Sequence, residues 1–152
     1  VSDSHLQGGF HNLSLATTRA DMVRAVMEGV AYNNHWLHGY VERFAKQRRD
    51  PIRTVGGGAV SDLWCQIHAD VMDRTIEQVA DPLHAQLRGA AILAGMSLGL
   101  VDRSDVCGLV VFAHTFSPDP ANRDVYDRLS AELPRLYKTQ KKMFRRLNGR
   151  WT

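Results

Sequence analysis

An α/β fold class is predicted by the order of the periodic segments along the chain. Residues 18–44 carry apolar side chains at three- and four-residue spacing, which indicates a helix. Two short β-branched runs, "IRTV" and "TIEQVA", have the composition of strands, and a helical pattern follows each of them. Strands that alternate with helices form a sheet covered by helices. Two strands make a small sheet, so we expect further strands upstream of Val1.

The first helix is predicted to begin after Thr18 and to reach about Phe44. Thr18 can cap the helix, and Asp21 places an acid in the first turn, where the helix dipole favours negative charge. Gly29 and Gly39 lower the helix propensity, so we expect close packing or a bend near them. The mostly apolar stripe of this helix comprises Val23, Val26, Met27, Val30, Asn34, Leu37, Val41 and Phe44.

A strand, a glycine loop and a second helix are predicted next. Pro51 closes a polar connection, and residues 52–55 suit a short buried strand. Three glycines separate this strand from the following helix, which either Ser61 or Asp62 would cap. The apolar face of that helix is predicted to comprise Leu63, Trp64, Ile67, Val71 and Met72.

The second strand candidate, residues 75–80, leads into a helix that is rich in small residues. Asp81 can cap this helix, with Pro82 at the first helical position. Glycine and alanine recur between residues 83 and 100, and such small side chains allow another backbone to approach closely.

The C-terminal part of the chain is predicted to be mainly helical. Ser104 would cap a short helix, and the segment "FAHTFSPDPAN", residues 112–122, is interpreted as a proline-rich loop. A helix then covers about residues 123–147, although Pro134 should end or kink its first half. The buried positions predicted for this helix are Tyr126, Leu129, Leu133, Leu136, Tyr137 and Phe144.

The composition is that of an ordinary soluble protein the size of one domain. The chain has 152 residues, of which 44% are hydrophobic and 23% charged. Its apolar runs are too short to cross a bilayer and its N-terminal segment does not resemble a signal peptide, so we expect a cytoplasmic protein that does not bind membranes. Cys65 and Cys107 lack metal-binding spacing and are expected to be buried or inert thiols.

The formal net charge of +3 owes much to one basic tail, "RLYKTQKKMFRRLNGR". Such a patch could attract phosphates. It has no accompanying aromatic platform or groove-reading motif, so a solvated helix face is favoured over nucleic-acid binding.

The triple glycine in "TVGGGAVSDLW", residues 54–64, is the sharpest functional signal in the sequence. Glycine accepts unusual backbone angles and has no Cβ to block a ligand, and the N–H groups that open the next helix attract anions. This pattern favours a nucleotide contact, while a tight turn without a ligand remains an equal alternative. The loop lacks the GK[ST] of a P-loop and the GxGxxG of dinucleotide folds.

Five segments in order resemble the C-terminal domain of the FGGY family of carbohydrate kinases, most closely its xylulokinase-like members. They are "GGFHNLSL", "TTRADMVRAVMEGVAYNNHWL", "VGGGAVSDLWCQIHADVMDRTIEQV", "RGAAILAGMSLGLV", and "FSPDPANRDVYDRL" followed by "LYKTQKKMFRRLN". The resemblance covers nearly the whole chain.

The resemblance implies a ribonuclease H-like, actin-like ATPase domain that lacks its first strands. Residues 1–152 would form part of the C-terminal ATP-binding domain, with a helical tail at about 120–150. Gly57, Gly58 and Ala59 match the family's adenosine motif and would contact the nucleotide through the backbone. Asp62 stands where the family has a polar residue near the adenine. At position 60, valine replaces the lysine often found in xylulokinase-like loops, which removes any charge contact there.

The mechanism implied is transfer of the γ-phosphoryl group from ATP, with Mg²⁺, to a hydroxyl of a sugar or polyol such as xylulose. In the family, the catalytic aspartate and the sugar site belong to the N-terminal domain, and we find neither that aspartate nor a Gly-Thr phosphate motif here. We therefore assign no catalytic residue and expect this chain alone to bind nucleotide weakly at best and not to catalyse transfer. We assign no metal site, because His35 and His38 lack a third ligand.

Two alternatives of other classes remain open at this point. The chain could be a non-catalytic interaction module whose sheet is completed by a partner or, as a homodimer, by a second copy. It could also be a nucleic-acid-binding domain that uses the basic tail. Trp64, although close to the glycine loop, is interpreted as a packing residue because of its spacing from Ile67 and Val71.

Overall fold

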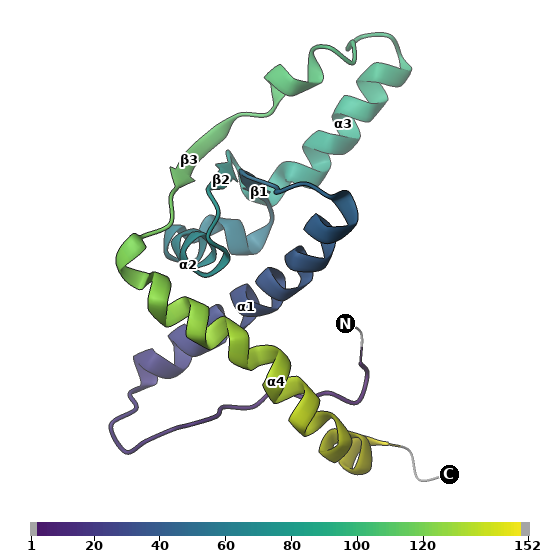
Figure 1. Cartoon of the computed structure of the whole chain (residues 1–152). Coiled ribbons are helices and arrows are strands. Elements are labelled where there is room, and N and C mark those ends of the chain that lie inside the picture. The colour runs from purple at the N-terminus through teal and green to yellow at the C-terminus, as the bar shows by residue number, and fades with distance from the viewer. Residues whose placement is uncertain (1–2, 150–152) are drawn as a thin grey trace. The chain divides into compact units, whose positions relative to one another are not determined.

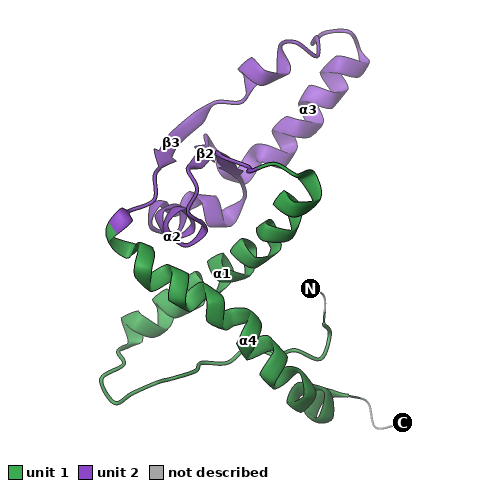
Figure 2. Ribbon diagram, viewed as in Figure 1, with its two compact units in different colours: residues 1–47, 121–152 green, residues 48–120 purple. Residues whose placement is uncertain are grey.

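The computed structural model describes residues 3–149, and the chain divides into two compact units. Unit 1 consists of residues 1–47 and 121–152, and unit 2 consists of residues 48–120 (Figures 1 and 2). The chain length alone did not indicate this division. No helix among the described residues combines the length and the apolar character that a membrane span requires.

A three-stranded sheet forms the centre of unit 2. Strand β1 (Ile52–Thr54) pairs in parallel with β2 (Ile76–Val79), and β2 pairs antiparallel with β3 (Phe112–Phe116). The two strands predicted from the sequence are confirmed, but the prediction of a loop at 112–116 was wrong. Two prolines follow β3 closely, and they led to the prediction of a loop. The short strand is held by its hydrogen bonds to β2.

Helix α2 (Asp62–Met72) connects β1 to β2 and carries much of the buried surface of unit 2. Its Ser61 cap accepts a hydrogen bond from the Trp64 N–H at 3.3 Å, which settles the choice between Ser61 and Asp62. The core contains Cys65, Ala69 and Ile76, with the half-buried Ile52 and Phe116 packed against it.

One prediction about a buried position in unit 2 needs correction. Leu63 was placed on the apolar face of α2, but its side chain is exposed. The predicted Ile67, Val71 and Met72 are buried, together with Cys65, Ala69 and Asp70. Cys65 is buried as expected, whereas Cys107 is exposed.

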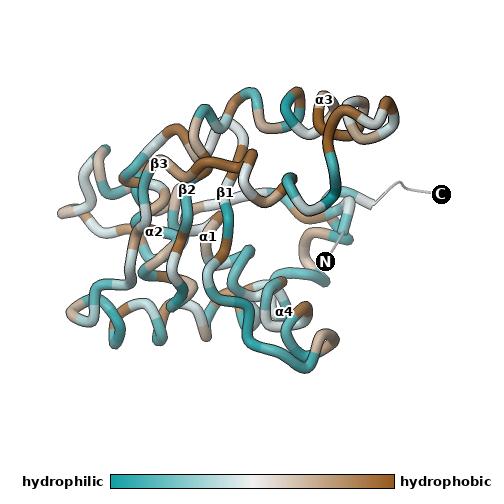
Figure 3. Tube along the Cα trace, turned by 90° about the horizontal axis from the view of Figure 1, so that it is seen from above, coloured by the Kyte–Doolittle hydropathy of each residue, from teal (hydrophilic) through white to brown (hydrophobic). Residues whose placement is uncertain are grey.

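Helix α3 (Ala85–Ser97) contains the small residues noted in the sequence but has no buried residue. Figure 3 shows its apolar character as brown along much of the helix. A short 3-10 helix, Pro82–His84, precedes it, and the side chain of Asp81 pairs with His84 instead of capping the backbone. Ser104 likewise does not cap the 3-10 helix Val106–Leu109, whose N-cap residue is Asp105.

Unit 1 is built on two long helices, α1 (Arg19–Ala45) and α4 (Arg123–Asn148). Thr18 and Asp21 form a reciprocal capping box, which confirms the predicted start of α1. Helix α4 is continuous through Pro134, so the prediction that this proline ends the helix was wrong, while the alternative of a kink stays a prediction. Of the six positions predicted to be buried in α4, Tyr126 is buried and Leu129 is exposed, while Leu133, Leu136, Tyr137 and Phe144 are intermediate.

Candidate functional site

The glycine loop joins the end of β1 to the start of α2, where a 3-10 helix, Gly57–Val60, makes the turn. Gly56 precedes this helix with a φ of 85°, a conformation that side chains rarely adopt. Its N–H donates to the carbonyl oxygen of Pro82 at 2.8 Å, which ties the loop to the segment after β2. The backbone conformation therefore accounts for the glycine at position 56.

A different reason accounts for glycine at position 58. A Cβ added to Gly58 would lie 3.1 Å from the ring of Trp64, which is tighter than ordinary van der Waals contact. The half-buried indole ring thus packs against the bare Cα of Gly58, in agreement with the predicted packing role of Trp64. Internal packing alone is a sufficient reason for glycine here.

Gly57 has neither of these explanations. It is exposed, its φ lies outside the left-handed region, and a Cβ added to it would meet no atom within 4 Å. The fold would accommodate a side chain at this position. Of the three glycines in the loop, Gly57 is the one whose bare backbone is left available for a ligand.

Ala59 is the buried residue of the loop, with only 3% of its surface exposed. Its N–H donates to the carbonyl oxygen of Gly56 at 3.1 Å, and its own carbonyl oxygen accepts a hydrogen bond from Nε2 of Gln78 at 2.6 Å. Both backbone polar groups of Ala59 therefore have partners within the protein. Any contact between Ala59 and a nucleotide would therefore be mainly a van der Waals contact.

Asp62 is the exposed first residue of α2, and the same Gln78 side chain reaches it. Nε2 of Gln78 donates to Oδ1 of Asp62 at 3.1 Å. Sequence reasoning missed Gln78, whose only signal was a polar amide inside a short strand. Burial also raises the pKa of the neighbouring Cys65 thiol, whose Sγ lies 3.8 Å from the Ala59 carbonyl oxygen.

Two other carboxylates, Asp21 and Asp70, serve structural roles. The backbone N–H of Thr18 donates to Asp21 at 2.9 Å and lowers the pKa of that carboxyl. Asp70 is buried and accepts hydrogen bonds from Gln66 at 2.7 Å and from the Asp119 N–H at 2.9 Å. No group of three His, Cys, Asp or Glu side chains in residues 3–149 is placed to hold a metal ion.

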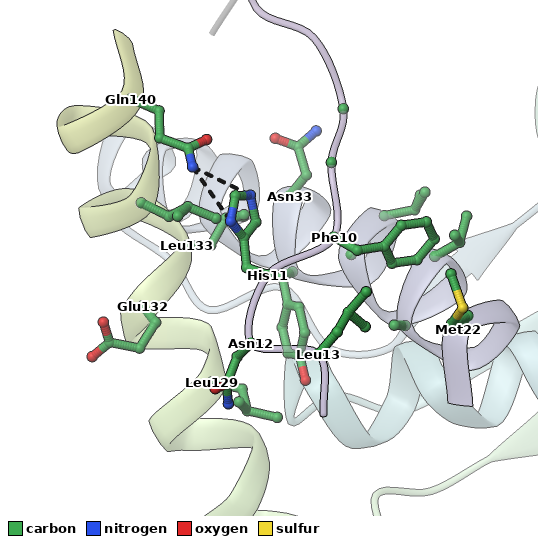
Figure 4. A pocket seen from close by; sticks show the side chains of 18 of the residues that line it. Phe10, His11, Asn12, Leu13, Met22, Asn33, Leu129, Glu132, Leu133 and Gln140 are labelled. Carbon is green, nitrogen blue, oxygen red and sulfur yellow. Dashed lines mark hydrogen bonds between the residues drawn. The ribbon is translucent and has the colours of Figure 1, made fainter. Parts of the chain in front are cut away.

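A pocket of about 1250 Å³ lies in unit 1 and shares no residue with the glycine loop. The segment that contains Phe10 and Leu13, helix α1 and helix α4 line it, largely with apolar side chains. Figure 4 shows His11 directed toward Gln140, with which it forms a hydrogen bond. The pocket therefore lies in a different unit from every site residue predicted from the sequence.

Comparison with known proteins decides the family. A model of the "FGGY family of carbohydrate kinases, C-terminal domain" matches residues 1–98. Xylulose kinase of Staphylococcus epidermidis is 30% identical over 145 residues, which cover 93% of this chain and 28% of that protein. The chain belongs to the FGGY family of carbohydrate kinases.

Solved structures of FGGY kinases agree with the fold. The crystal structure of xylulose kinase from Rhodospirillum rubrum has a TM-score of 0.78 and 34% identity, covering 93% of this chain and 29% of that one. Plasmodium falciparum glycerol kinase, solved with ADP, has a TM-score of 0.68 at 22% identity, which supports the fold alone. This FGGY domain therefore has the ribonuclease H-like, actin-like fold expected from the resemblance, and it spans under a third of the length of these kinases.

Proposed function

We propose that this chain is the ATP-binding part of a carbohydrate kinase that transfers the γ-phosphoryl group of ATP to a hydroxyl of a sugar or polyol, with a xylulose-like substrate. The observation that carries the proposal is Gly57, an exposed glycine at a strand-to-helix junction whose missing side chain neither packing nor backbone conformation explains. The FGGY family match supplies the chemical class.

In this proposal the loop residues bind and orient the nucleotide. Gly57 and Gly58 provide backbone surface, Ala59 sets the shape beneath them, and Asp62 accepts a hydrogen bond from the base. The exposed Val60 contributes no charge. These residues act by holding ATP in place, which lowers the barrier through alignment of the reacting groups.

Mg²⁺ enters the proposal with the phosphates of ATP, whose charge it neutralises during phosphoryl transfer. Because the described residues hold no cluster of metal ligands, we derive no magnesium site within this chain. We propose that the catalytic base and the sugar site belong to parts of the kinase outside this sequence. The cytoplasmic location and the homodimer stay predictions.

The decisive variant is Gly57→Val, because the structure leaves room for it. Gly58 is less informative, since even alanine there would press on the Trp64 ring and change the loop from within. The matched control is Gly108→Val, because Gly108 also lies exposed in a 3-10 helix of unit 2 with nothing within 4 Å of an added Cβ.

Titration calorimetry with ATP and ADP in the presence of Mg²⁺ tests the proposal. We expect saturable binding to the unaltered chain and to Gly108→Val. Gly57→Val should bind at least about tenfold more weakly, a loss of about 1.4 kcal/mol. Unchanged affinity in Gly57→Val, or no nucleotide binding by the unaltered chain, would contradict the proposal.

A further inference from the structure

The side chain of Gln78 joins the two halves of the glycine loop. Gln78 is 5% exposed and lies on β2, opposite Thr54 of β1 and His114 of β3. Its single amide nitrogen donates to the carbonyl oxygen of Ala59 at 2.6 Å and to Oδ1 of Asp62 at 3.1 Å. An amide nitrogen has two hydrogens, so these two bonds use its full donor capacity.

We infer that Gln78 is a positioning residue that sets the shape of the loop and the orientation of the Asp62 carboxylate for the nucleotide. The inference rests on the proposed function for its ligand. Gln78 itself is buried beneath the loop and acts through the two groups that it holds. One side chain thereby couples the backbone just after Gly57 and Gly58 to the first residue of α2.

The chemistry of the two partners explains why glutamine is required at this position. A carbonyl oxygen and a carboxylate can only accept hydrogen bonds, so the group between them must donate twice. Methionine has a similar length but no donor and would leave the buried Ala59 carbonyl without this bond, which is costly. Glutamate is worse, because its carboxylate would face a second carboxylate at hydrogen-bonding distance.

Unit 2 contains a second glutamine with the same type of partners, which provides a matched control. Nε2 of Gln66 donates to Oδ1 of Asp70 at 2.7 Å and to the carbonyl oxygen of Ser117 at 2.8 Å. This pair of bonds joins α2 to the segment after β3 and includes no atom of residues 56–62. Gln66→Met therefore removes hydrogen bonds to the same two types of acceptor from the same unit without touching the loop, at a side chain that is half-buried where Gln78 is buried.

The experiment compares Gln78→Met, Gln66→Met, Gln78→Glu, and the double variant Gln78→Glu with Asp62→Asn. The first measurement is hydrogen exchange without nucleotide at the amides of Gly56, Ala59 and Ser61, each of which donates within or from the loop. The second measurement is the dissociation constant for ATP with Mg²⁺. Thermal unfolding shows that each variant is folded during both measurements.

We expect Gln78→Met to increase exchange at the three loop amides about tenfold and to weaken ATP binding about tenfold. Gln66→Met should change neither quantity by more than about twofold, even if both variants lose similar stability. Gln78→Glu should weaken binding further. Asp62→Asn should restore part of the loss, because an asparagine amide can donate to the new carboxylate, while the Ala59 carbonyl oxygen still lacks a donor from residue 78.

Equal effects of Gln78→Met and Gln66→Met on the loop, or no restoration by Asp62→Asn, would overturn the inference. If Gln78→Met does not fold, Asp62→Ala at the exposed end of the same hydrogen bond takes its place, and faster exchange at the same loop amides is still expected. Failure of the proposed function has a different signature: the unaltered chain would not bind ATP, while loop exchange would still respond selectively to Gln78.

Discussion

The two units of the chain are held together in different ways. Of the twelve buried residues among those described, ten belong to unit 2, whereas unit 1 contributes only Ala31 and Tyr126. Unit 2 is a small sheet with a buried apolar core, in which Ile67, Val71 and Ile76 are almost completely buried. Unit 1 is a pair of long helices with little buried apolar surface.

A polar cluster compensates for the small core of unit 1. Nη2 of Arg24 donates to the hydroxyl of Tyr126 at 2.9 Å, and that hydroxyl donates to Oε1 of Glu28 at 2.9 Å. Arg24 also bonds Glu28 directly at 2.8 Å, and the Tyr32 hydroxyl donates to Glu28 at 3.4 Å. These bonds connect α1 to α4.

The comparison shows why the glycine loop belongs to unit 2. A binding loop needs supports whose own positions are fixed by packing, and β2 supplies them through Ile76 and Gln78 on the same strand. In unit 1 the hydrogen bonds include those of Arg24, whose side chain is 48% exposed, so water can replace part of that support.

The largest effect is expected from Ile76→Ala in unit 2. The change opens a cavity between the sheet and α2, and removal of a fully buried isoleucine side chain costs about 2–5 kcal/mol. Urea denaturation, monitored by hydrogen exchange of the amides of unit 2, measures this loss of unfolding free energy. Leu87→Ala is the control, because Leu87 is 68% exposed on α3 and should change stability by less than about 0.5 kcal/mol. Similar losses in both variants would mean that the burial of Ile76 does not stabilise unit 2.

A smaller effect is expected from Tyr126→Phe in unit 1. This change keeps the ring but removes the hydroxyl between Arg24 and Glu28, which should cost about 1–3 kcal/mol. Hydrogen exchange of α1 and α4 amides would report the loss, with the half-exposed Tyr40→Phe as control. If Tyr126→Phe were as stable as the unaltered chain, the cluster would not be the main support of unit 1.

Local signals predicted several elements correctly because their stability is local. The capping box of Thr18 and Asp21 and the cap at Ser61 are formed within one turn, so the sequence displays them directly. The glycine loop was predicted for a similar reason, since strand, turn and helix follow one another without a gap. Its nucleotide contacts stay a prediction.

The elements that sequence reasoning missed depend on partners distant in the chain. Strand β3 exists because Phe116 pairs with Ile76, forty residues earlier. Helix α4 continues through Pro134, at a typical cost of about 3 kcal/mol, while its buried Tyr126 holds it against α1. Gln78 could not be found from the sequence because its two acceptors come close only after β2 lies beside β1.

The smallest effect is a loss of the unfolding free energy of unit 1 at alkaline pH, because two tyrosines of this unit titrate there. Burial, and then the charge of Glu28, raise the pKa of Tyr32 above its ordinary value of 10.0, and burial also raises the pKa of Tyr126. The folded chain therefore keeps phenolic protons that the unfolded chain releases. Their stabilising contribution is complete below about pH 10 and is lost as the pH rises toward the higher pKa of the folded state.

Tyr32→Phe should therefore make unit 1 less sensitive to alkali. At pH 8 this variant should nearly match the unaltered chain, since the bond it loses is long, and this comparison serves as the internal control. By pH 11 the unaltered chain should have lost more of its unfolding free energy than the variant, by at most about 1.4 kcal/mol for one tyrosine. Urea denaturation at both pH values measures the difference. Parallel losses in the two proteins would mean that the buried phenol of Tyr32 does not couple folding of the helix pair to pH.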